Sequence, residues 1–326
     1  MIFPISEFFS IESDFDLIFL DETTDFRNDI DIAIRLGEPE SGEDAELVES
    51  RGYTFFQDDI QRSIIDIRGA DKRCELRATA DVIEVVVTDA YRQQFTKRLS
   101  PSESAAFTEL LVSIIQYRLL ADDATIVYAA AVRSPDGVGV LIFGPGDSGK
   151  STTVYRLTQE YDYELLADDL VIFHGGSVYP FPRSVDLPLD ISEAKDAVER
   201  LREKPGLQIW ESVVSIPRKH LRSTTSKINP EFCFFLRPRG DRVQEFSTIS
   251  SKDAQEIAVA LNESYSREWT ASEPVRRFFT RYTTYADRDN RDSILRETVG
   301  NSSSLLIESD SVQFSDMISE WISSKS

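Results

Sequence analysis

Cysteine and histidine are scarce in this sequence of 326 residues, which contains only two of each. Cys74 and Cys233 lie far apart in the chain and show no C-x-x-C spacing. Together with His174 and His220 they could form a zinc site only if the fold gathered all four residues, which their spacing does not indicate. We therefore expect both cysteines to be small, buried or half-buried apolar residues.

Lysine accounts for only 9 of the 36 basic residues, and the 57 acidic residues give the chain a net charge of -21. Nonspecific binding to DNA or RNA requires a surface rich in lysine and arginine, so this charge argues strongly against it. A surface rich in aspartate and poor in lysine suits a cytosol crowded with salt, because counter-ions screen the self-repulsion. The composition therefore predicts a halophilic source, with an ordinary acidic cytosolic protein as the alternative.

Apolar runs long enough to span a bilayer are also missing. The first residues, MIFPISEFFSIESDFD, lack the positively charged start of a signal peptide and soon become acidic. Apolar residues make up 41% and charged residues 29% of the chain, which is typical of a globular protein. We expect a cytoplasmic protein with no membrane partner, long enough for two domains.

The first hundred residues predict strands. Residues 29–36 alternate cleanly between polar and apolar, and residues 81–89 form a β-branched run. The period then changes to that of a helix from Pro101, with Ser100 as its N-cap. Its apolar stripe consists of Phe107, Leu110, Leu111, Ile114, Ile115 and Leu119. We therefore predict a strand-rich α+β domain at 1–120, ending in this amphipathic helix, and a second domain at 121–326.

The second domain alternates strands, loops and helices from residue 124 onward. Residues 125–132 and 137–143 are apolar runs that predict two buried strands, and helical spacing follows at 150–161. Three further strands are predicted before residue 182, with His174–Gly176 as a tight turn. The polar segment at 287–293 is typical of an exposed loop. This order of elements predicts an α/β domain.

The stretch GPGDSGKS fits G-x-x-x-x-G-K-[ST], the P-loop that surrounds the phosphates of a nucleoside triphosphate. Its glycines allow backbone N–H groups to turn toward the phosphates, and the helix that follows adds its positive end. Lys150 is expected to reach the β- and γ-phosphates, and the Ser151 hydroxyl to hold Mg²⁺. The alternative is a plain glycine turn. The predicted nucleotide-binding residues are Gly144, Pro145, Gly146, Asp147, Ser148, Gly149, Lys150, Ser151 and Thr152.

Two adjacent carboxylates, Asp168 and Asp169, follow the apolar residues of ELLADDLVIF. Such a pair is costly after a buried strand unless a cation lies beside it, and the Mg²⁺ of the nucleotide is the obvious one. One carboxylate serves the metal, and the other is free to take a proton from an attacking hydroxyl. The pair comes only 18 residues after Lys150. This short spacing favours a kinase over an ATPase or switch, with a surface turn as the alternative.

GVLI, GPGDSGKST and LLADDLVIF, followed by a hairpin and a Pro-rich segment, resemble the HPr kinase/phosphorylase family. That family shares its P-loop arrangement with ATP-dependent phosphoenolpyruvate carboxykinase. The close match covers residues 126–188, and the N-terminal half looks like that of the HPr-kinase-related branch. The resemblance implies ATP and Mg²⁺ as cofactors, Asp169 as proton acceptor and Asp168 as its metal-side partner. It also implies a kinase that acts on a protein serine or a small-molecule hydroxyl, and a possible homo-oligomer.

The sequence departs from the family at two places. Tyr128 stands where the family usually has a histidine, and the family's glutamate-containing signature is absent from 186–221. HPr-specific activity and reverse phosphorolysis are therefore not predicted, and a nucleotide-binding sensor with little or no phosphotransfer is the alternative to a kinase. A further cation on the transferred phosphate could come from residues 217–222, residues 236–242 or Arg183, although a surface arginine paired locally is the alternative for each.

Overall fold

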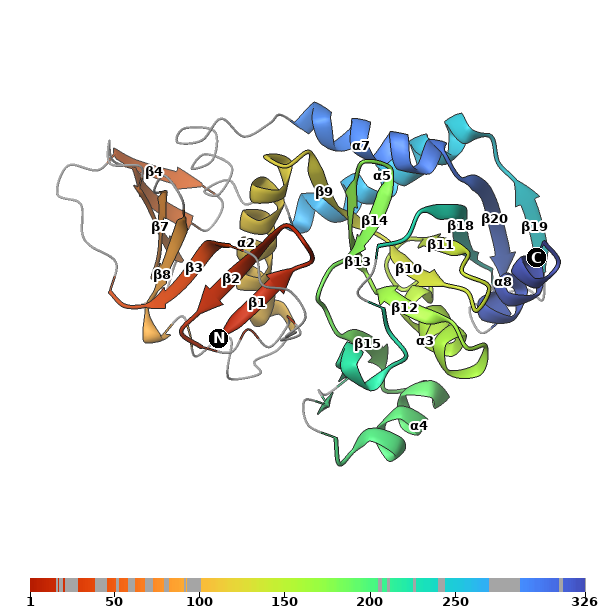
Figure 1. Ribbon diagram of the computed structural model, residues 1–326. Helices are drawn as coiled ribbons and strands as arrows, with labels where there is room; N and C mark the ends of the chain where they lie inside the picture. Colours follow the sequence, from red (N-terminus) through yellow and green to blue (C-terminus); the bar gives the residue numbers. More distant parts are fainter. Residues whose placement is uncertain are drawn as a thin grey trace. The chain divides into compact units, whose positions relative to one another are not determined.

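The structure is a computed structural model that describes most residues of the chain (Figure 1). These are residues 1–15, 17, 20, 29–38, 46–50, 53–57, 62–67, 73–78, 82–90, 92, 101–204, 207–209, 212–224, 227–239, 244–269, 288–310 and 313–325. The chain divides into two compact units. Unit 1 comprises Met1–Asp122 and Ser266–Ala286, and unit 2 comprises Asp123–Tyr265 and Asp287–Ser326.

Unit 1 contains an eight-stranded sheet in the order β1-β2-β3-β8-β7-β6-β5-β4. β2 pairs with β3, and β3 with β8, in parallel, whereas the other neighbours are antiparallel. The strands are β1 (Ile2–Ile5), β2 (Phe9–Ser13), β3 (Ile30–Leu36), β4 (Glu46–Ser50), β5 (Tyr53–Gln57), β6 (Arg62–Ile67), β7 (Arg73–Ala78) and β8 (Ile83–Val87). The strands predicted at 29–36 and 81–89 are confirmed as β3 and β8.

The helix predicted from Pro101 is confirmed as α2 (Pro101–Leu120), while its expected cap, Ser100, lies outside the described residues. Its apolar positions from Leu110 to Leu119 are buried. The burial is wider than the predicted stripe, because Ser113 and Gln116 are buried as well. Hydrophobic spacing identified the helix but underestimated how much of its surface is covered.

Unit 2 is organised around a six-stranded sheet in the order β12-β10-β11-β18-β20-β19. β11, β18 and β20 run parallel to one another, and the other neighbours are antiparallel. The strands are β10 (Ala130–Arg133), β11 (Gly139–Phe143), β12 (Glu164–Ala167), β18 (Pro230–Pro238), β19 (Glu245–Thr248) and β20 (Ser303–Ser309). Each parallel strand needs a crossover connection, so helices lie on both faces of the sheet.

The helices of unit 2 pack in two groups (Figure 1). Alternate residues of β11 and β18 enter two separate apolar cores, Val140 and Phe234 into one and Leu141 and Phe235 into the other. The first core also receives side chains from α3 (Lys150–Glu160), α4 (Ser192–Leu201) and α8 (Phe314–Ser323). The second receives them from α5 (Ser251–Trp269) and α7 (Arg288–Gly300). Because successive side chains of a strand point to opposite faces, one core lies on each face of the sheet.

Two three-stranded sheets complete unit 2, in the orders β14-β13-β9 and β15-β17-β16. The strands are β9 (Ala124–Tyr128), β13 (Leu170–His174), β14 (Ser177–Pro180), β15 (Val185–Pro188), β16 (Gln208–Ile209) and β17 (Val213–Ile216), and a 3₁₀ turn spans Arg218–His220. The single strand predicted at 125–132 is wrong. The chain changes sheets at Ala129, whose N–H donates to the carbonyl of Asp169 at 3.1 Å.

The loop predicted at 287–293 is also wrong, because α7 begins at Arg288. Leu295 and Val299, one helical turn apart, are fully buried and fasten this otherwise polar segment to the sheet.

Cys74 and Cys233 are buried free thiols, as expected. The sheets and helices described above confirm a mixed α/β fold. In the part of the chain that the structure describes, no helix has the length and apolarity needed to cross a bilayer.

Candidate functional site

The loop between β11 and α3 has the strand–loop–helix context that a P-loop requires. Gly149 ends the loop with φ +91°, a left-handed conformation that glycine adopts without strain. A Cβ added at Gly144 would lie only 2.4 Å from the Ser148 Oγ, so the loop closes tightly at its start. Pro145, Gly146 and Asp147 are exposed between these two points. The middle of the loop is therefore open to a ligand.

Lys150 opens α3, and its side chain is almost completely buried, with 3% of its surface exposed. Its Nζ donates to the carbonyl oxygens of Gly144 and Pro145, both at 3.0 Å. Burial lowers the pKa of Lys150, and the nearby carboxylates of Asp169, Asp168 and Asp147 oppose that shift. The lysine thus folds back onto the loop that it is expected to serve. Ser151 and Thr152 follow it in the first turn and are half-buried.

Asp168 lies where the chain leaves β12, and only 1% of its surface is exposed. Neither carboxylate oxygen receives a hydrogen bond of ordinary geometry. Burial, followed by the neighbouring Asp169 carboxylate, raises the pKa of Asp168 to about 8, although Ser151 and Lys150 lower it in part. A buried carboxylate without donors is unfavourable unless it is protonated or a cation lies beside it. Asp168 therefore suits a metal ligand.

Asp169 has φ +62°, a left-handed conformation that is uncommon outside glycine. The turn is braced by the Leu170 N–H, which donates to the carbonyl of Asp168 at 2.7 Å, and by the Ala129 contact described above. Strained backbone of this kind is concentrated at functional sites. The turn separates the two carboxylates: Asp168 is buried in the protein, while 21% of the Asp169 side chain is exposed.

Arg183, between β14 and β15, is the charged partner of this turn. Its Nη1 lies 3.8 Å from the Asp169 Oδ2, and its Nη2 donates to the Asp186 Oδ2 at 3.3 Å. A side-chain hydrogen bond also joins Arg183 to Tyr265 of α5. Burial alone lowers the pKa of Arg183, but Asp169 and Asp186 outweigh it and the net shift is upward. Arg183 therefore remains a cation beside the acid pair.

The other basic candidates have different partners. Arg218 is buried and donates to the carbonyl of Thr224 at 2.8 Å. Arg237 and Arg239 both pair with Glu308, at 3.2 Å and 2.7 Å, while residues 240–242 lie outside the described ranges. Among the described basic residues of the three candidates, Arg183 is the one that forms an ion pair with Asp169.

Several aromatic and polar residues at this site were not predicted as site residues. Tyr128, at the end of β9, stacks on Tyr265 with ring centroids 3.6 Å apart and planes 6° apart. Its N–H donates to the Asn262 Oδ1 at 3.0 Å. Asn262 and Tyr265 are three residues apart and so share one face of α5. No local motif marks these contacts, because Tyr128 and Asn262 are 134 positions apart in the chain.

The arrangement is chemically suited to a metal–phosphate ligand. Mg²⁺ is usually held by one or two carboxylates together with phosphate oxygens and water, and rarely by a cage of protein ligands. Ser151 and Asp168 could supply that small set of oxygens. Among the residues that the structure describes, no group of three or more histidine, cysteine, aspartate or glutamate side chains could hold a metal ion by itself.

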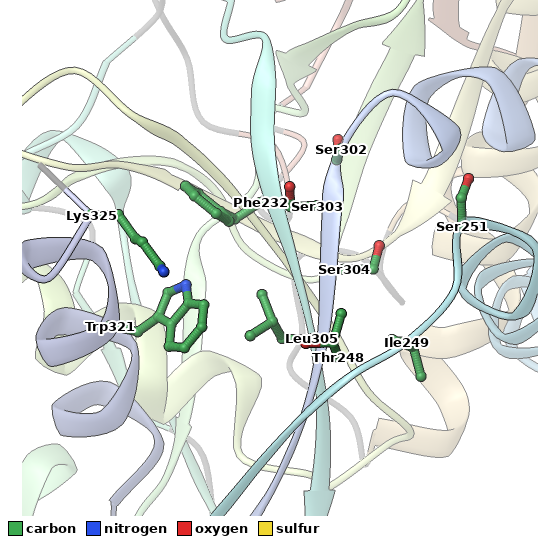
Figure 2. A pocket seen from close by; sticks show the side chains of 10 residues that line it. All are labelled: Phe232, Thr248, Ile249, Ser251, Ser302, Ser303, Ser304, Leu305, Trp321 and Lys325. Atoms are coloured by element: carbon green, nitrogen blue, oxygen red, sulfur yellow. The ribbon is translucent and has the colours of Figure 1, made fainter.

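A separate cavity of about 620 Å³ lies at the opposite end of the six-stranded sheet (Figure 2). The loop at residues 144–149 follows the carboxyl end of β11. The cavity is instead lined by Phe232 near the amino end of β18 and by residues 302–305 at the amino end of β20. Trp321 and Lys325 cover its other side. Ligands of open α/β sheets bind outside the carboxyl ends of the strands, so the end that carries the loop at 144–149 is the stronger candidate for a ligand site.

No protein-family model and no curated protein matches the chain. The assignment of a function to this site therefore depends on its residues and their geometry.

Proposed function

We propose that this protein is an ATP- and Mg²⁺-dependent kinase that transfers the γ-phosphate to a hydroxyl group. The observation that carries the proposal is the buried Asp168 carboxylate, which lacks ordinary hydrogen-bond donors beside a P-loop and its lysine. A divalent cation bound with the nucleotide would satisfy this carboxylate. The resemblance to the HPr kinase/phosphorylase family supports the same reading of the residues.

In the proposed reaction the loop amides and Lys150 would bind the phosphates of ATP, and Ser151 and Asp168 would hold Mg²⁺, which would offset negative charge on those phosphates. Asp169, partly exposed at its strained turn, accepts the proton of the attacking hydroxyl. Arg183 contributes a fixed positive charge near the position of the transferred group. The acceptor would be a protein serine or a small molecule with a hydroxyl.

The second candidate is a nucleotide-binding sensor with little or no transfer. Two observations favour it. Lys150 is engaged by the carbonyls of its own loop, and Asp169 is near enough to Arg183 to be held as an ion pair instead of acting as a base. In a sensor, nucleotide binding would rearrange these contacts and alter how the protein binds its partner.

Incubation of the protein with γ-labelled ATP and Mg²⁺ in molar KCl separates the two candidates. The acceptors to be offered are lysate proteins, hydroxy acids and hydroxyl-bearing amino acids, with a reaction lacking acceptor as the control. Label transferred to an acceptor supports the kinase. Nucleotide binding without label on any acceptor, and with no release of phosphate, contradicts the kinase and supports the sensor.

A further inference from the structure

The ring of Tyr128 lies over Lys150 and also stacks on Tyr265. The Lys150 Nζ is 4.0 Å from the centroid of the Tyr128 ring, within the range of a cation–π interaction. The far side of the same ring is covered by Tyr265, and their nearly parallel planes give a closely packed pair. The Tyr128 ring, at the end of β9, therefore contacts both Lys150 and Tyr265 of α5, and it forms one wall beside the lysine.

The pair also reaches the second cation of the site. Tyr265 is joined by a side-chain hydrogen bond to Arg183, the residue that faces Asp169. Burial raises the pKa of both phenols, so each hydroxyl keeps its proton over the physiological range. One aromatic pair thus contacts Lys150 through the ring of Tyr128 and Arg183 through the hydroxyl of Tyr265.

We propose that Tyr128 and Tyr265 are positioning residues for the phosphotransfer site, with Tyr128 orienting Lys150 and Tyr265 orienting Arg183. The inference rests on the proposed nucleotide-binding function. The Tyr128 ring attracts the Lys150 ammonium and so restricts where that group can lie. The Tyr265 hydroxyl binds the Arg183 guanidinium, which also pairs with Asp169 and Asp186. These three contacts together restrict the orientation of the guanidinium relative to the reacting phosphate.

The two roles predict different kinetic effects. Tyr128→Leu removes the ring beside Lys150, and we expect the Kd for Mg²⁺-ATP to rise about 5-fold, whereas Tyr128→Phe keeps the ring and should stay within about 2-fold of the wild type. Tyr265→Phe keeps the stack but loses the hydroxyl. It should lower kcat about 10-fold while the Kd remains within about 2-fold. Tyr265→Leu should show both effects.

The experiment measures Mg²⁺-ATP binding by calorimetry, and ATP turnover with the acceptor or with water, for these four variants and the wild type. Equal binding by Tyr128→Leu and Tyr128→Phe, or a wild-type kcat in Tyr265→Phe, overturns the proposal. If Tyr128→Leu does not fold, Tyr265→Leu carries the binding test, because it removes the ring that holds Tyr128 in place. A wild-type Kd in Tyr265→Leu would then overturn the proposal.

Measurements on the wild-type protein distinguish failure of the positioning roles from failure of the proposed function. Wild-type binding and turnover with no difference between the matched variants reject the positioning roles and leave the kinase intact. A folded wild type that does not bind nucleotide rejects the proposed function, and the positioning roles with it.

Discussion

The two ends of the parallel strands β11, β18 and β20 differ in the kind of residue that they bury. At the carboxyl end, ionisable side chains lie close together, with Lys150 and Asp168 almost completely buried. At the amino end, the cavity is lined mainly by serines and apolar side chains, and its lysine, Lys325, is exposed and lies 4.6 Å from the centroid of the Trp321 ring. A buried charge costs far more free energy than a buried hydroxyl.

This difference indicates which end of the sheet has a site for a ligand. The hydroxyl of Ser302 at the amino end is already satisfied by the carbonyl of Pro230 at 2.8 Å. The Asp168 carboxylate at the carboxyl end has no hydrogen bond of ordinary geometry. Ser151 and Lys150 offset its burial only in part, so its ionised form is unfavourable unless a cation lies beside it. Residues that break the usual rules of burial and backbone conformation are expected at functional sites. The variants below test whether the two ends differ in function as they do in charge.

The largest effect is expected for Asp169→Asn. Without the base, kcat for transfer should fall by about 10²- to 10⁴-fold, while Mg²⁺-ATP should bind with a Kd within about 3-fold of the wild type. The matched control is Asp162→Asn: Asp162 also has a positive φ, of 61°, but its side chain is 84% exposed and pairs with Arg222. Steady-state transfer assays and calorimetry provide the comparison. Unchanged turnover in Asp169→Asn would remove the proposed base.

Asp168→Asn tests the free-energy cost of the buried carboxylate. The folded-state pKa, about 8, lies above the ordinary value of 3.8, so the folded protein binds the extra proton between these two pH values. The stability contribution of Asp168 is therefore greatest at low pH and falls as pH rises through this window. The stability of the Asn variant relative to the wild type should increase over the same window, by an amount on the order of a few kcal/mol.

Denaturant unfolding of the two proteins from pH 4 to pH 9 measures that difference. Mg²⁺ at pH 8 should stabilise the wild type more than Asp168→Asn, because the cation replaces the proton as partner of the carboxylate. If the difference in stability between the two proteins does not change with pH, the raised pKa of the buried Asp168 carboxyl is contradicted.

Gly144→Ala and Gly146→Ala form a matched pair within the loop. A Cβ at position 144 would meet the Ser148 Oγ at 2.4 Å, whereas a Cβ at position 146 would meet nothing within 4 Å. We expect Gly144→Ala to lower the free energy of unfolding by about 1–3 kcal/mol and Gly146→Ala to have little effect. Urea or guanidinium midpoints at constant salt test this expectation, and equal midpoints for both variants would show that the loop is not closed in this way.

The smallest effect is expected at the amino end. The Ser304 Oγ is buried without a hydrogen-bond partner, so Ser304→Ala removes an unsatisfied group and should leave stability within about 0.5 kcal/mol of the wild type, or raise it slightly. Its Kd for Mg²⁺-ATP should not change. A Kd raised as much by Ser304→Ala as by a variant of Lys150 would end the distinction between the two ends of the sheet.

Local sequence patterns predicted the strand, loop and helix at residues 139–160. The spacing of Gly144, Gly149 and Lys150, between an apolar strand and a helix, is contained within a few residues and so can be read directly. The acid pair was equally visible, because Asp168 and Asp169 interrupt an apolar run. Their unequal burial and the left-handed turn at Asp169 depend on the change of sheet at this point, which no local pattern marks.

Contacts between distant segments could not be predicted in the same way. The apolar run at 125–132 continues across the change of sheet at Ala129, so hydrophobicity alone merged two strands into one. The Asn262 contact with Tyr128 joins residues 134 positions apart. Asn262 and Tyr265 look like ordinary helix residues until α5 packs beside β9. These long-range contacts supply the aromatic wall beside Lys150.

The most direct test of the nucleotide site is calorimetric titration of Mg²⁺-ATP into the wild type, Lys150→Ala and Lys195→Ala in molar KCl. Lys195 is an exposed lysine of α4 and controls for loss of charge alone. High salt is used because a chain with a net charge of -21 repels itself strongly when it is not screened. We predict binding by the wild type and Lys195→Ala, and a Kd at least about 100-fold weaker for Lys150→Ala. Equal binding by all three, or no binding by a folded wild type, would contradict the proposed site.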